Sequence, residues 1–508
     1  MASRRDEQAR LIADQQATIA QLSASVTQLN VLIGELRAMM EQIRTASSAR
    51  EQELQSQLEA MTRKALGKSS EKMPSPKDAL RKKDATKADP VATQQKRRDN
   101  QARKDALETE DLLHSVPEAD RAACPSCASS DLQQDVPRQR VDYDYVPGYF
   151  RRRVHQQEVL VCRGCKAEVV ADLPKRPFDK SPYGPGLIAH VVVQKCACSV
   201  PIYRLEKQFK WLGIPMSRST MTDLFHMTAD KLRPLYQRLL YRIAQSDIVL
   251  ADETTLKMQD RGKCGYMWTF RTTKLIAYKF SPSRSGATPK QVLGGTIGTL
   301  VVDAYTGYNP VVDVDGRVRA GCLAHVRRKF FDALANAPEA QIALDLILDV
   351  YRVEHLATEQ GITRSEAHAL LRDTESRAAM AKLHTWLTAQ DGIHLPKGPM
   401  GKAVAYALDN WEHLQVFLND VCVPVDNNAS ERALRIVALG RKNFMFVGHE
   451  AAGQNLAVLY SLMATCEEHG VDPHAYLADV LLRIDDHPNR LIDELLPDHW
   501  AAQQANAA

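Results

Sequence analysis

Residues 248–252 read IVLAD and residues 299–303 read TLVVD, and these two stretches decide the fold of the chain. Each is a short apolar run of the kind that forms a buried β-strand, and each ends in an aspartate. Tyr266–Phe270 and Leu275–Phe280, which lie between them, read as two further strands joined by a hairpin. This order predicts an α/β domain in which adjacent strands bring Asp252 and Asp303 side by side.

The paired aspartates predict a divalent-metal site on a ribonuclease-H-like core. Carboxylates this close repel each other, and the repulsion raises their pKa values unless a cation neutralises them. Hard oxygen ligands of this kind select Mg²⁺ or Mn²⁺, and with a third carboxylate they can hold two ions for in-line phosphoryl transfer. The spacing alone leaves a plainer interpretation open, in which Asp252 and Asp303 only cap loops at strand ends.

The third carboxylate is expected from a helix that returns to the sheet, and residues 426–432, DNNASER, open such a helix with Glu431. Asn428 and Glu431 have the spacing of a capping box, so the alternative is that the Glu431 carboxylate only accepts a hydrogen bond from a backbone N–H. The following segment is basic and aromatic, which suits a surface that grips a phosphodiester. Its members are Arg435, Arg441, Lys442, Asn443, Phe444 and Phe446.

The 127 residues between Asp303 and Glu431 exceed what a bare ribonuclease-H-like fold needs. Helical patterns over Pro338–Ala389 and Ala403–Val421 predict an all-helical insertion at residues 336–422. The expected domains of this part are a catalytic core split into residues 246–335 and 423–470, and a C-terminal helix and tail at 471–508.

The N-terminal heptads predict self-association. Through residues 1–62, apolar residues recur every seven positions, mostly β-branched at one position and mostly leucine three residues later, which favours a parallel two-stranded coiled coil. The seam consists of Ile12, Ile19, Val26, Ile33 and Met40 with Leu22, Leu29, Leu36 and Ile43. The alternative is a single amphipathic helix packed on its own chain.

Residues 63–104 form a basic linker, with 14 Lys or Arg against 5 Asp or Glu. This composition cannot build a core, so we expect a flexible tether. Its concentrated positive charge predicts contact with nucleic-acid phosphates through counterion release. Because the whole chain carries only +4, the remainder is slightly acidic.

Two CxxC pairs predict a zinc ribbon in residues 105–180. The first pair is Cys124 and Cys127, and the second pair is Cys162 and Cys165. The 34 residues between the pairs read partly as strands, so the four thiolates can share one tetrahedral Zn²⁺. Four cysteine ligands leave no open position, so the zinc is expected to be structural.

Residues 181–245 read as a helix-turn-helix-like DNA-binding segment. A helix over Tyr203–Leu212 is followed by a glycine-containing turn and by a second helix that Ser217 can cap. An ordinary helical hairpin fits the same pattern. The first residues of the second helix, where recognition helices meet base edges, are Arg218, Ser219 and Thr220.

Composition narrows the class of protein further. With 508 residues and 44% hydrophobic residues, the chain can build several cores, which excludes wholesale disorder. Its apolar runs are much shorter than the ~20 residues of a membrane span, and its first ten residues show no signal-peptide pattern. We therefore expect a cytoplasmic protein without membrane contact, associated with the bacterial nucleoid.

Ordered motifs along most of the chain carry a family resemblance. Besides the heptads and the four cysteines, they are ADET at 251–254, GYMW at 265–268, SPSRSG at 281–286, DAYTGY at 303–308, CLAHVRRKF at 322–330, DNNASER at 426–432 and GRKN at 440–443. Their order resembles that of the transposases of the insertion sequence 66 family of bacterial mobile elements. One departure is Leu323, where the family pattern has Trp.

The resemblance implies a DDE transposase whose catalytic triad is Asp252, Asp303 and Glu431, with Asp252 preferred over the adjacent Glu253. It also implies that Cys322 and His325 support the fold of the active site. Candidates for contacts with DNA phosphate are Arg327, Arg328, Lys329, Arg441 and Lys442, of which the first three also fit a solvated helix face.

The expected function is therefore metal-dependent cleavage and strand transfer of double-stranded DNA at the ends of an insertion sequence. The expected metals are Mg²⁺ or Mn²⁺ at the active site and structural Zn²⁺. Expected partners are transposon-end and target DNA, a second copy of the chain, and any accessory proteins of the same element. Two alternatives stay open: a non-catalytic zinc-ribbon DNA-binding regulator, and a metal-dependent nuclease without joining activity.

Overall fold

The computed structural model describes residues 25–41, 172–214, 216–260, 264–312 and 316–507, together with isolated residues and short segments between residues 18 and 170. Most of the basic linker lies outside the described residues. The chain divides into two compact units. The larger contains Met1–Pro76, Lys175–Leu205 and Ser217–Ala508, and the smaller contains Lys77–Pro174 and Glu206–Met216.

The four zinc ligands expected from the sequence cannot be compared with the structure. Cys124, Cys127, Cys162 and Cys165 all lie outside the described residues. The zinc ribbon and its metal therefore stay predictions.

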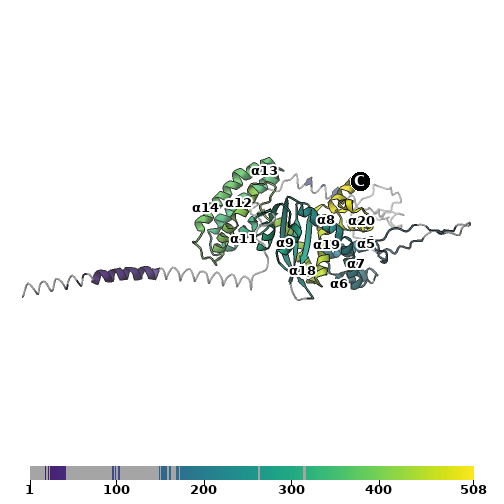
Figure 1. Ribbon diagram of the computed structural model, residues 1–508, viewed down its shortest axis with the longest axis horizontal. Helices are drawn as coiled ribbons and strands as arrows, with labels where there is room; N and C mark the ends of the chain where they lie inside the picture. Colours follow the sequence, from purple (N-terminus) through teal and green to yellow (C-terminus); the bar gives the residue numbers. More distant parts are fainter. Residues whose placement is uncertain are drawn as a thin grey trace, which may run out of the picture. The chain divides into compact units, whose positions relative to one another are not determined.

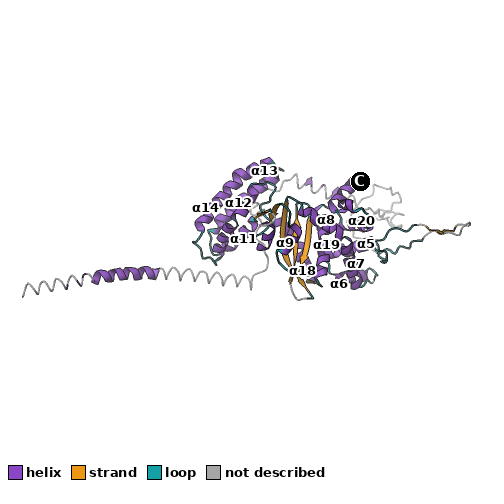
Figure 2. Cartoon of the chain, viewed as in Figure 1, coloured by secondary structure: helices purple, strands orange, loops and turns teal. Residues whose placement is uncertain are grey.

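A six-stranded mixed sheet forms the centre of the larger unit (Figures 1 and 2). Five strands follow the order β5-β4-β3-β6-β7, in which β3, β4 and β5 are antiparallel neighbours and β3, β6 and β7 are parallel neighbours. The sixth strand, β8, pairs with the far end of β3. The strands are β3 (Ile248–Met258), β4 (Cys264–Arg271), β5 (Ile276–Ser281), β6 (Gly298–Val301), β7 (Arg317–Ala320) and β8 (Phe446–Val447).

The first strand is longer than its apolar run. We expected it to end at Asp252, but β3 continues to Met258, so this expectation is wrong. The reason is long-range pairing: β4 is in antiparallel register with β3 from Leu250 to Lys257, and β8 pairs with its last two residues. Asp252 therefore lies within a strand, just beyond the part of β3 that pairs with β6.

Helices lie on both sides of the sheet (Figure 1). The preceding helices are α5 (Pro185–Cys196), α6 (Ile202–Trp211), α7 (Arg218–Lys231) and α8 (Arg233–Ala244), and α19 (Glu450–Glu468), α20 (Pro473–Arg483) and α21 (Pro497–Ala507) end the chain. Ser217 caps α7 as expected, because its Oγ accepts a hydrogen bond from the Thr220 N–H at 3.1 Å. None of the helices in the described part of the chain combines the length and apolar character that crossing a bilayer requires.

Helix α19 covers the edge strand β5. The hydroxyl of Ser461 accepts a hydrogen bond from the Tyr278 N–H at 2.8 Å, and Thr465 Oγ1 donates to the Ile276 carbonyl at 2.9 Å. Ser461 and Thr465 are four residues apart, so their hydroxyls lie on one helix face. These contacts satisfy backbone groups that an uncovered edge strand would leave open to another chain.

The helical insertion packs on the other side of the sheet. Residues 336–422, all of which the structure describes, contain helices and no strand, as expected. Leu250, Val301 and Ala320 of the sheet share one hydrophobic core with the insertion. The helices on this side are α11 (Leu323–Ala333), α12 (Ala340–Glu359), α13 (Glu366–Leu371), α14 (Arg377–Gln390) and α15 (Pro399–Asp409).

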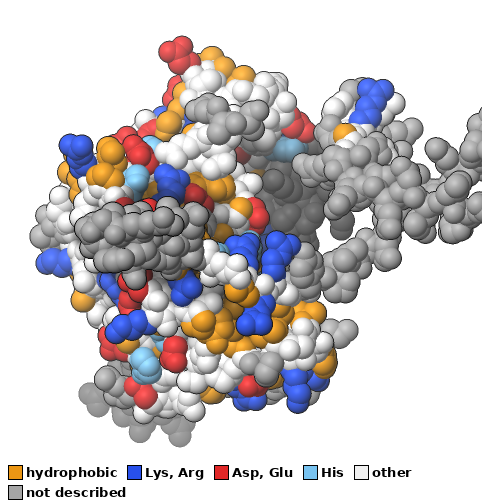
Figure 3. Space-filling view, turned by 90° about the vertical axis from the view of Figure 1, so that its right-hand side faces the viewer, with side chains coloured by type: hydrophobic (Ala, Val, Ile, Leu, Met, Phe, Trp, Pro, Cys, Tyr) orange, Lys and Arg blue, Asp and Glu red, His pale blue; other side chains and the backbone are white. Residues whose placement is uncertain are grey.

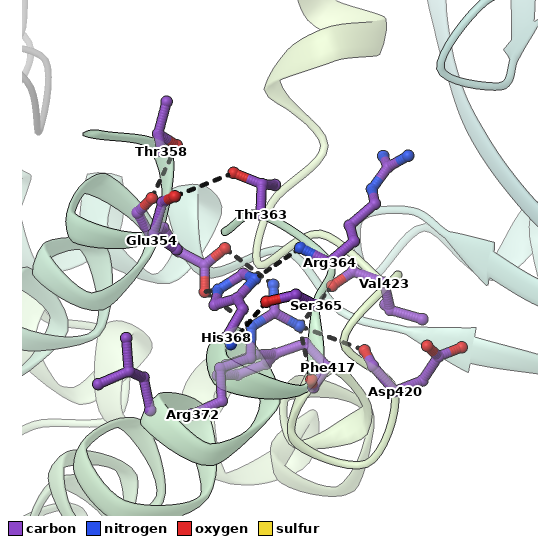
Figure 4. Close-up of polar contacts among 12 residues, drawn as sticks. Glu354, Thr358, Thr363, Arg364, Ser365, His368, Arg372, Phe417, Asp420 and Val423 are labelled. Atoms are coloured by element: carbon purple, nitrogen blue, oxygen red, sulfur yellow. Dashed lines mark hydrogen bonds and ion pairs between the residues drawn. The ribbon is translucent and has the colours of Figure 1, made fainter. Parts of the chain in front are cut away.

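A buried polar network stabilises the insertion (Figure 4). Arg372, whose side chain is 3% exposed, forms two 2.8 Å hydrogen bonds with Glu354 of α12. Its Nη1 donates to the carbonyl oxygens of Phe417, Asp420 and Val423 at 2.8, 3.2 and 2.9 Å. The side chain of Arg372 thus joins α12 to the segment that precedes residues 426–432.

Residues 25–41 form an α-helix with an exposed apolar seam. The side chains at the expected heptad positions have exposed fractions of 44–69%, namely Val26, Leu29, Ile33, Leu36 and Met40. The described part of the N-terminal segment is therefore helical, as predicted. Pairing with a second copy stays a prediction.

The smaller unit contains a short antiparallel hairpin. Its strands are β1 (Val159–Val161) and β2 (Glu168–Val170), with Val159 opposite Val170. Cys162 and Cys165 lie in the sequence between these strands. The hairpin matches the strand expected at this CxxC pair, whereas zinc ligation by Cys162 and Cys165 is not tested by it.

Candidate active site

Asp252 on β3 and Asp303, two residues after the end of β6, occupy matching positions relative to the parallel pairing of these strands. The register pairs Leu250 with Val301, and each aspartate lies two residues beyond this pair. Because side chains two residues apart share a face of a sheet, Asp252 lies on the same face as Leu250. The strand register thus brings the two aspartates together, and the negative charge of Asp303 acts on Asp252.

Backbone hydrogen bonds orient both carboxylates. Asp252 Oδ1 accepts from the Glu253 N–H at 2.9 Å, and Asp303 Oδ1 accepts from the Tyr305 N–H at 2.9 Å. The guanidinium of Arg319 on β7 donates to the carbonyl oxygens of Asp303 and Tyr305 at 2.6 and 2.8 Å. The loop after β6 is therefore tied to the next strand, which holds Asp303 at the end of the sheet.

Helix α17 (Asn428–Ala433) brings Glu431 to the same region. Asn427, which is 1% exposed, donates from Nδ2 to the Ala251 carbonyl at 2.7 Å and from its backbone N–H to Cys322 Sγ at 3.2 Å. The start of α17 is thus anchored to the residue before Asp252. Glu431 follows about one helical turn later.

The capping-box interpretation of Glu431 is wrong. The N-cap of α17 is Asn427 rather than Asn428, and its side chain makes no capping hydrogen bond. The Asn428 N–H donates to Asp426 Oδ1 at 3.0 Å. The Glu431 carboxylate instead faces α11, where Arg328 Nη2 lies 3.4 Å from Oε2 and His325 Nε2 lies 3.8 Å from Oε1. The side chain is therefore directed to its neighbours across the site and not to the backbone of its own helix.

Cys322 and His325 lie where the site meets α11. Cys322 is 2% exposed, and burial raises the pKa of its thiol to about 12, so it carries a proton at neutral pH. The Sγ atom of Cys322 accepts a hydrogen bond from the Asn427 N–H at 3.2 Å. Burial lowers the pKa of His325, which the negative charges of Asp303 and Glu431 oppose. These contacts fit the supporting role proposed for both residues.

Burial and neighbouring charges perturb Asp252 strongly. Burial raises its pKa to about 7, and the negative charges of Glu253, Asp303 and Glu431 add to this effect. Within the described residues, however, no group of three or more His, Cys, Asp or Glu is assembled closely enough to hold a metal ion. The three carboxylates thus interact electrostatically without forming a compact ligand set.

Comparison with known proteins identifies the family of the chain. The family model described as "Transposase IS66 family" matches residues 180–455, and the one described as "IS66 C-terminal element" matches residues 461–497. The chain belongs to the IS66 transposase family. The resemblance drawn from the sequence motifs is confirmed, and membership supports a role in DNA transposition by an enzyme that acts on DNA.

Relatives of this IS66-family chain occur in Sinorhizobium fredii (strain NBRC 101917 / NGR234). The uncharacterized protein y4jD is 33% identical over 415 residues, which cover 77% of this chain and 80% of the relative. The uncharacterized protein y4hP is 30% identical over 433 residues, which cover 80% and 77%. Neither name states an activity, so the chemistry has to be argued from the site.

Glu253 is already engaged by other side chains of the IS66-family site. Its side chain is 3% exposed and accepts hydrogen bonds from Arg284 Nε at 2.8 Å, from Arg284 Nη2 at 2.6 Å and from Tyr308 Oη at 2.7 Å. Glu253 is therefore paired within the protein, and the preference for Asp252 over Glu253 stays a prediction. The sequence motifs SPSRSG and DAYTGY contained Arg284 and Tyr308, but their spacing did not indicate that both contact Glu253.

The expected DNA-binding residues fall into different environments. Arg327 is 7% exposed, so the phosphate contact or solvated face expected for it is wrong: this face of α11 lies inside the molecule. Arg328 is exposed, and Lys329 Nζ lies over the Tyr406 ring at 4.4 Å. Arg441 Nη1 donates to the carbonyl and hydroxyl oxygens of Thr255, both at 2.8 Å, which ties α18 (Arg435–Phe444) to β3.

Exposed basic and aromatic side chains also occur around the helix-turn-helix-like segment. Arg218 and Ser219 are exposed at the start of α7, whereas Thr220 Oγ1 is hydrogen-bonded to Ser217 Oγ at 2.9 Å. On α6, Trp211 is 72% exposed and Lys207 Nζ lies 5.1 Å from its ring centroid. Figure 3 shows a face on which Lys and Arg side chains lie beside hydrophobic ones.

Proposed function

We propose that this chain is a DDE transposase that cleaves the ends of an insertion sequence and joins them to target DNA. The observation that carries the proposal is that Asp252 on β3 and Asp303 just after β6 lie at matching positions, two residues beyond the last pair of these parallel strands. Glu431 lies on a helix that is anchored beside Asp252. The strand order β5-β4-β3-β6-β7 supports a ribonuclease-H-like catalytic core.

Asp252, Asp303 and Glu431 would hold Mg²⁺ or Mn²⁺, and the ions would draw together carboxylates that do not form a compact ligand set by themselves. Burial and neighbouring carboxylates raise the pKa of Asp252 to about 7, so a cation would relieve a repulsion that the fold creates. When bound, divalent ions would activate the attacking oxygen and stabilise the leaving oxygen of a phosphodiester. Arg328 and His325 position Glu431 for this role through their contacts with its carboxylate.

The other modules would bring DNA and a second copy of the chain to this site. The basic linker, the zinc ribbon and the start of α7, with Arg218 and Ser219, would contact DNA. Arg328, Lys329 and Lys442 would contact DNA phosphates near the core, whereas Arg441 would stabilise the junction of α18 and β3. The exposed seam of residues 25–41 would pair with a second copy. The structural Zn²⁺ of the ribbon would be bound by Cys124, Cys127, Cys162 and Cys165.

The direct test uses purified protein, Mg²⁺ or Mn²⁺, and labelled duplexes that carry the ends of the element. The wild-type protein should cleave the end and join it to a target duplex. The variants Asp252→Asn, Asp303→Asn and Glu431→Gln should lose both steps while still binding DNA. Asp349→Asn is a matched control, because Asp349 is 49% exposed on α12, outside the site.

Each alternative function gives a different result in this assay. A nuclease without joining activity would release cleaved ends but form no joined product. A regulator would bind the duplex without cleaving it. If any triad variant cleaved like the wild-type protein, the assignment of that carboxylate would be wrong.

A further inference from the structure

The guanidinium of Arg284 lies beside the carboxylate site and has no role in the scheme above. Arg284 belongs to the SPSRSG motif, in the loop between β5 and α9 (Ala287–Leu293). Its side chain is 47% exposed, although it is ion-paired with Glu253, whose side chain is 3% exposed. A guanidinium that is ion-paired on one edge and exposed on the other edge suggests a ligand-binding role.

Glu253 fixes one edge of the guanidinium. Arg284 Nε and Nη2 both donate to Glu253 Oε1, at 2.8 and 2.6 Å. Tyr308 Oη donates to the other oxygen, Glu253 Oε2, at 2.7 Å. Both carboxylate oxygens are therefore hydrogen-bonded, and the cation is tied to the residue next to Asp252.

Tyr305 fixes the face of the guanidinium. The Arg284 guanidinium carbon lies 4.0 Å from the centroid of the Tyr305 ring, and Tyr305 Oη donates to the Arg284 carbonyl. The backbone N–H of the same tyrosine holds Asp303. Buried Trp268 contacts Tyr305 from β4, with ring centroids 6.5 Å apart. Arg284 is thus connected to both aspartates, through Glu253 on β3 and through Tyr305 in the loop after β6.

The loop that carries Arg284 packs closely against the loop that carries Asp303 and Tyr305. A Cβ atom at Gly286 would lie 2.6 Å from the Gly307 carbonyl oxygen, which is closer than real Cβ atoms approach. A Cβ at Gly307 would lie 2.2 Å from the Tyr305 ring. Glycine at 286 therefore lets the Arg284 loop contact the Asp303 loop directly, and glycine at 307 leaves room for the Tyr305 ring.

The free edge of the guanidinium retains hydrogen-bond donors. Among the described residues, none is hydrogen-bonded to the Nη1 amino group of Arg284. By contrast, Arg441 Nη1 already donates hydrogen bonds to Thr254 and Thr255 of β3. Arginine presents its donors in a planar fork that matches phosphate oxygens, and a prearranged fork loses less entropy on binding.

We propose that Arg284 binds a non-bridging oxygen of a DNA phosphate next to the phosphodiester that is cleaved. This inference rests on the proposed function, because it places DNA against Asp252 and Asp303. A DNA backbone that approaches these carboxylates meets negative charge, and Arg284 supplies the opposite charge beside them. Glu253, Tyr305 and Tyr308 are positioning residues that orient the guanidinium without contacting DNA.

The test is the salt dependence of DNA binding without divalent metal. A labelled duplex that carries the end of the element is titrated between about 50 and 200 mM salt. Each phosphate contact contributes about 0.9 to the slope of log K against log salt, so Arg284→Gln should reduce the slope by about 0.9. Its affinity should fall about tenfold, as expected for the loss of one charge-assisted contact. In turnover with metal, KM should rise more than kcat falls.

Arg377→Gln is the matched control. Arg377 is 48% exposed and ion-paired with Asp373 on the helical insertion, so it shares the exposure and pairing of Arg284 but lies outside the site. Its slope and affinity should equal those of the wild-type protein. Arg284→Lys should keep the slope, because the charge remains, but bind more weakly, because the fork is lost.

Two results would overturn the proposal. If Arg284→Gln kept the wild-type slope, Arg284 would only neutralise Glu253. If Arg284→Gln melted well below the wild-type protein, its weaker DNA binding could result from misfolding, and Arg284→Lys would then be the deciding variant. An Arg284→Lys protein that bound DNA as tightly as the wild-type protein would contradict a contact made by the guanidinium fork. A wild-type protein that binds DNA but never cleaves it would refute the proposed function, while the slope comparison would still test Arg284.

Discussion

Asp252 is the residue at which burial and charge act most strongly on the site. They raise its pKa to about 7, whereas an unfolded chain leaves an aspartate near its ordinary pKa of about 4. Between about pH 4 and pH 7, the folded protein therefore keeps a proton on Asp252 that the unfolded chain has already released. Stability that is present below pH 4 is consequently lost as the pH rises towards 7.

Asp252→Asn should stabilise the metal-free protein at pH 8, because an amide has no charge to desolvate. We expect a gain on the order of 4 kcal/mol, seen as a rise of several degrees in Tm by differential scanning calorimetry. Near pH 4 the variant and the wild-type protein should melt alike. Asp349→Asn, at a 49% exposed position, should change little at either pH. A loss of stability at pH 8 would contradict the raised pKa.

At the scale of elements, the helical insertion is coupled to the chain that leads to Glu431. Arg372 joins Glu354 of α12 to the carbonyls of Phe417, Asp420 and Val423 (Figure 4). Tyr351, also on α12, donates to Asp426 Oδ2 at 2.7 Å, two residues before α17 begins. The insertion therefore helps to set the position of the helix that carries Glu431.

Arg372→Ala should destabilise the protein by about 3–5 kcal/mol, because it leaves a partly buried Glu354 and several carbonyls without their partner. Thermal unfolding measures the loss. Arg377→Ala removes a 48% exposed partner of an ion pair in the same insertion and should cost less than about 1 kcal/mol. Equal effects of the two substitutions would show that the Arg372 network does not stabilise the insertion.

At the scale of the whole molecule, charge and exposed apolar surface are concentrated near the N-terminus. Residues 63–104 carry an excess of nine positive charges, whereas the whole chain carries +4. Residues 25–41 form a helix whose apolar side chains are exposed in a single chain. A helix of this kind gains most of its stability from packing against a partner.

Leu29→Glu should convert a dimer into a monomer, because it places a charge in the coiled-coil seam. Val31→Glu is a stringent control: both side chains are 58% exposed in the single chain, but Val31 lies on the heptad position opposite the seam. Analytical ultracentrifugation should therefore detect monomers only for Leu29→Glu. If the wild-type protein sedimented as a monomer, or if both variants behaved alike, the coiled-coil prediction would fail.

Local patterns in the sequence were sufficient to predict the main helices and strands and to select Asp252 and Asp303 as candidate site residues. Apolar runs of four residues predicted β3 and β6, and the two runs placed Asp252 and Asp303 at the same distance along these strands. The Ser217 cap and the helical insertion were predictable for the same reason, since capping and helical periodicity depend on near neighbours. The order of the motifs also sufficed to predict the family.

Only the tertiary structure decided how these parts meet. Glu253 accepts from Arg284, 31 positions away, and Asn427 anchors α17 to β3 across 176 positions. The burial of Arg327, the extension of β3 to Met258 and the contacts of Glu431 with α11 likewise depend on packing between distant segments. A one-dimensional pattern specifies which residues are apolar, charged or helix-forming, but the partner of each charge is chosen by strand register and helix packing.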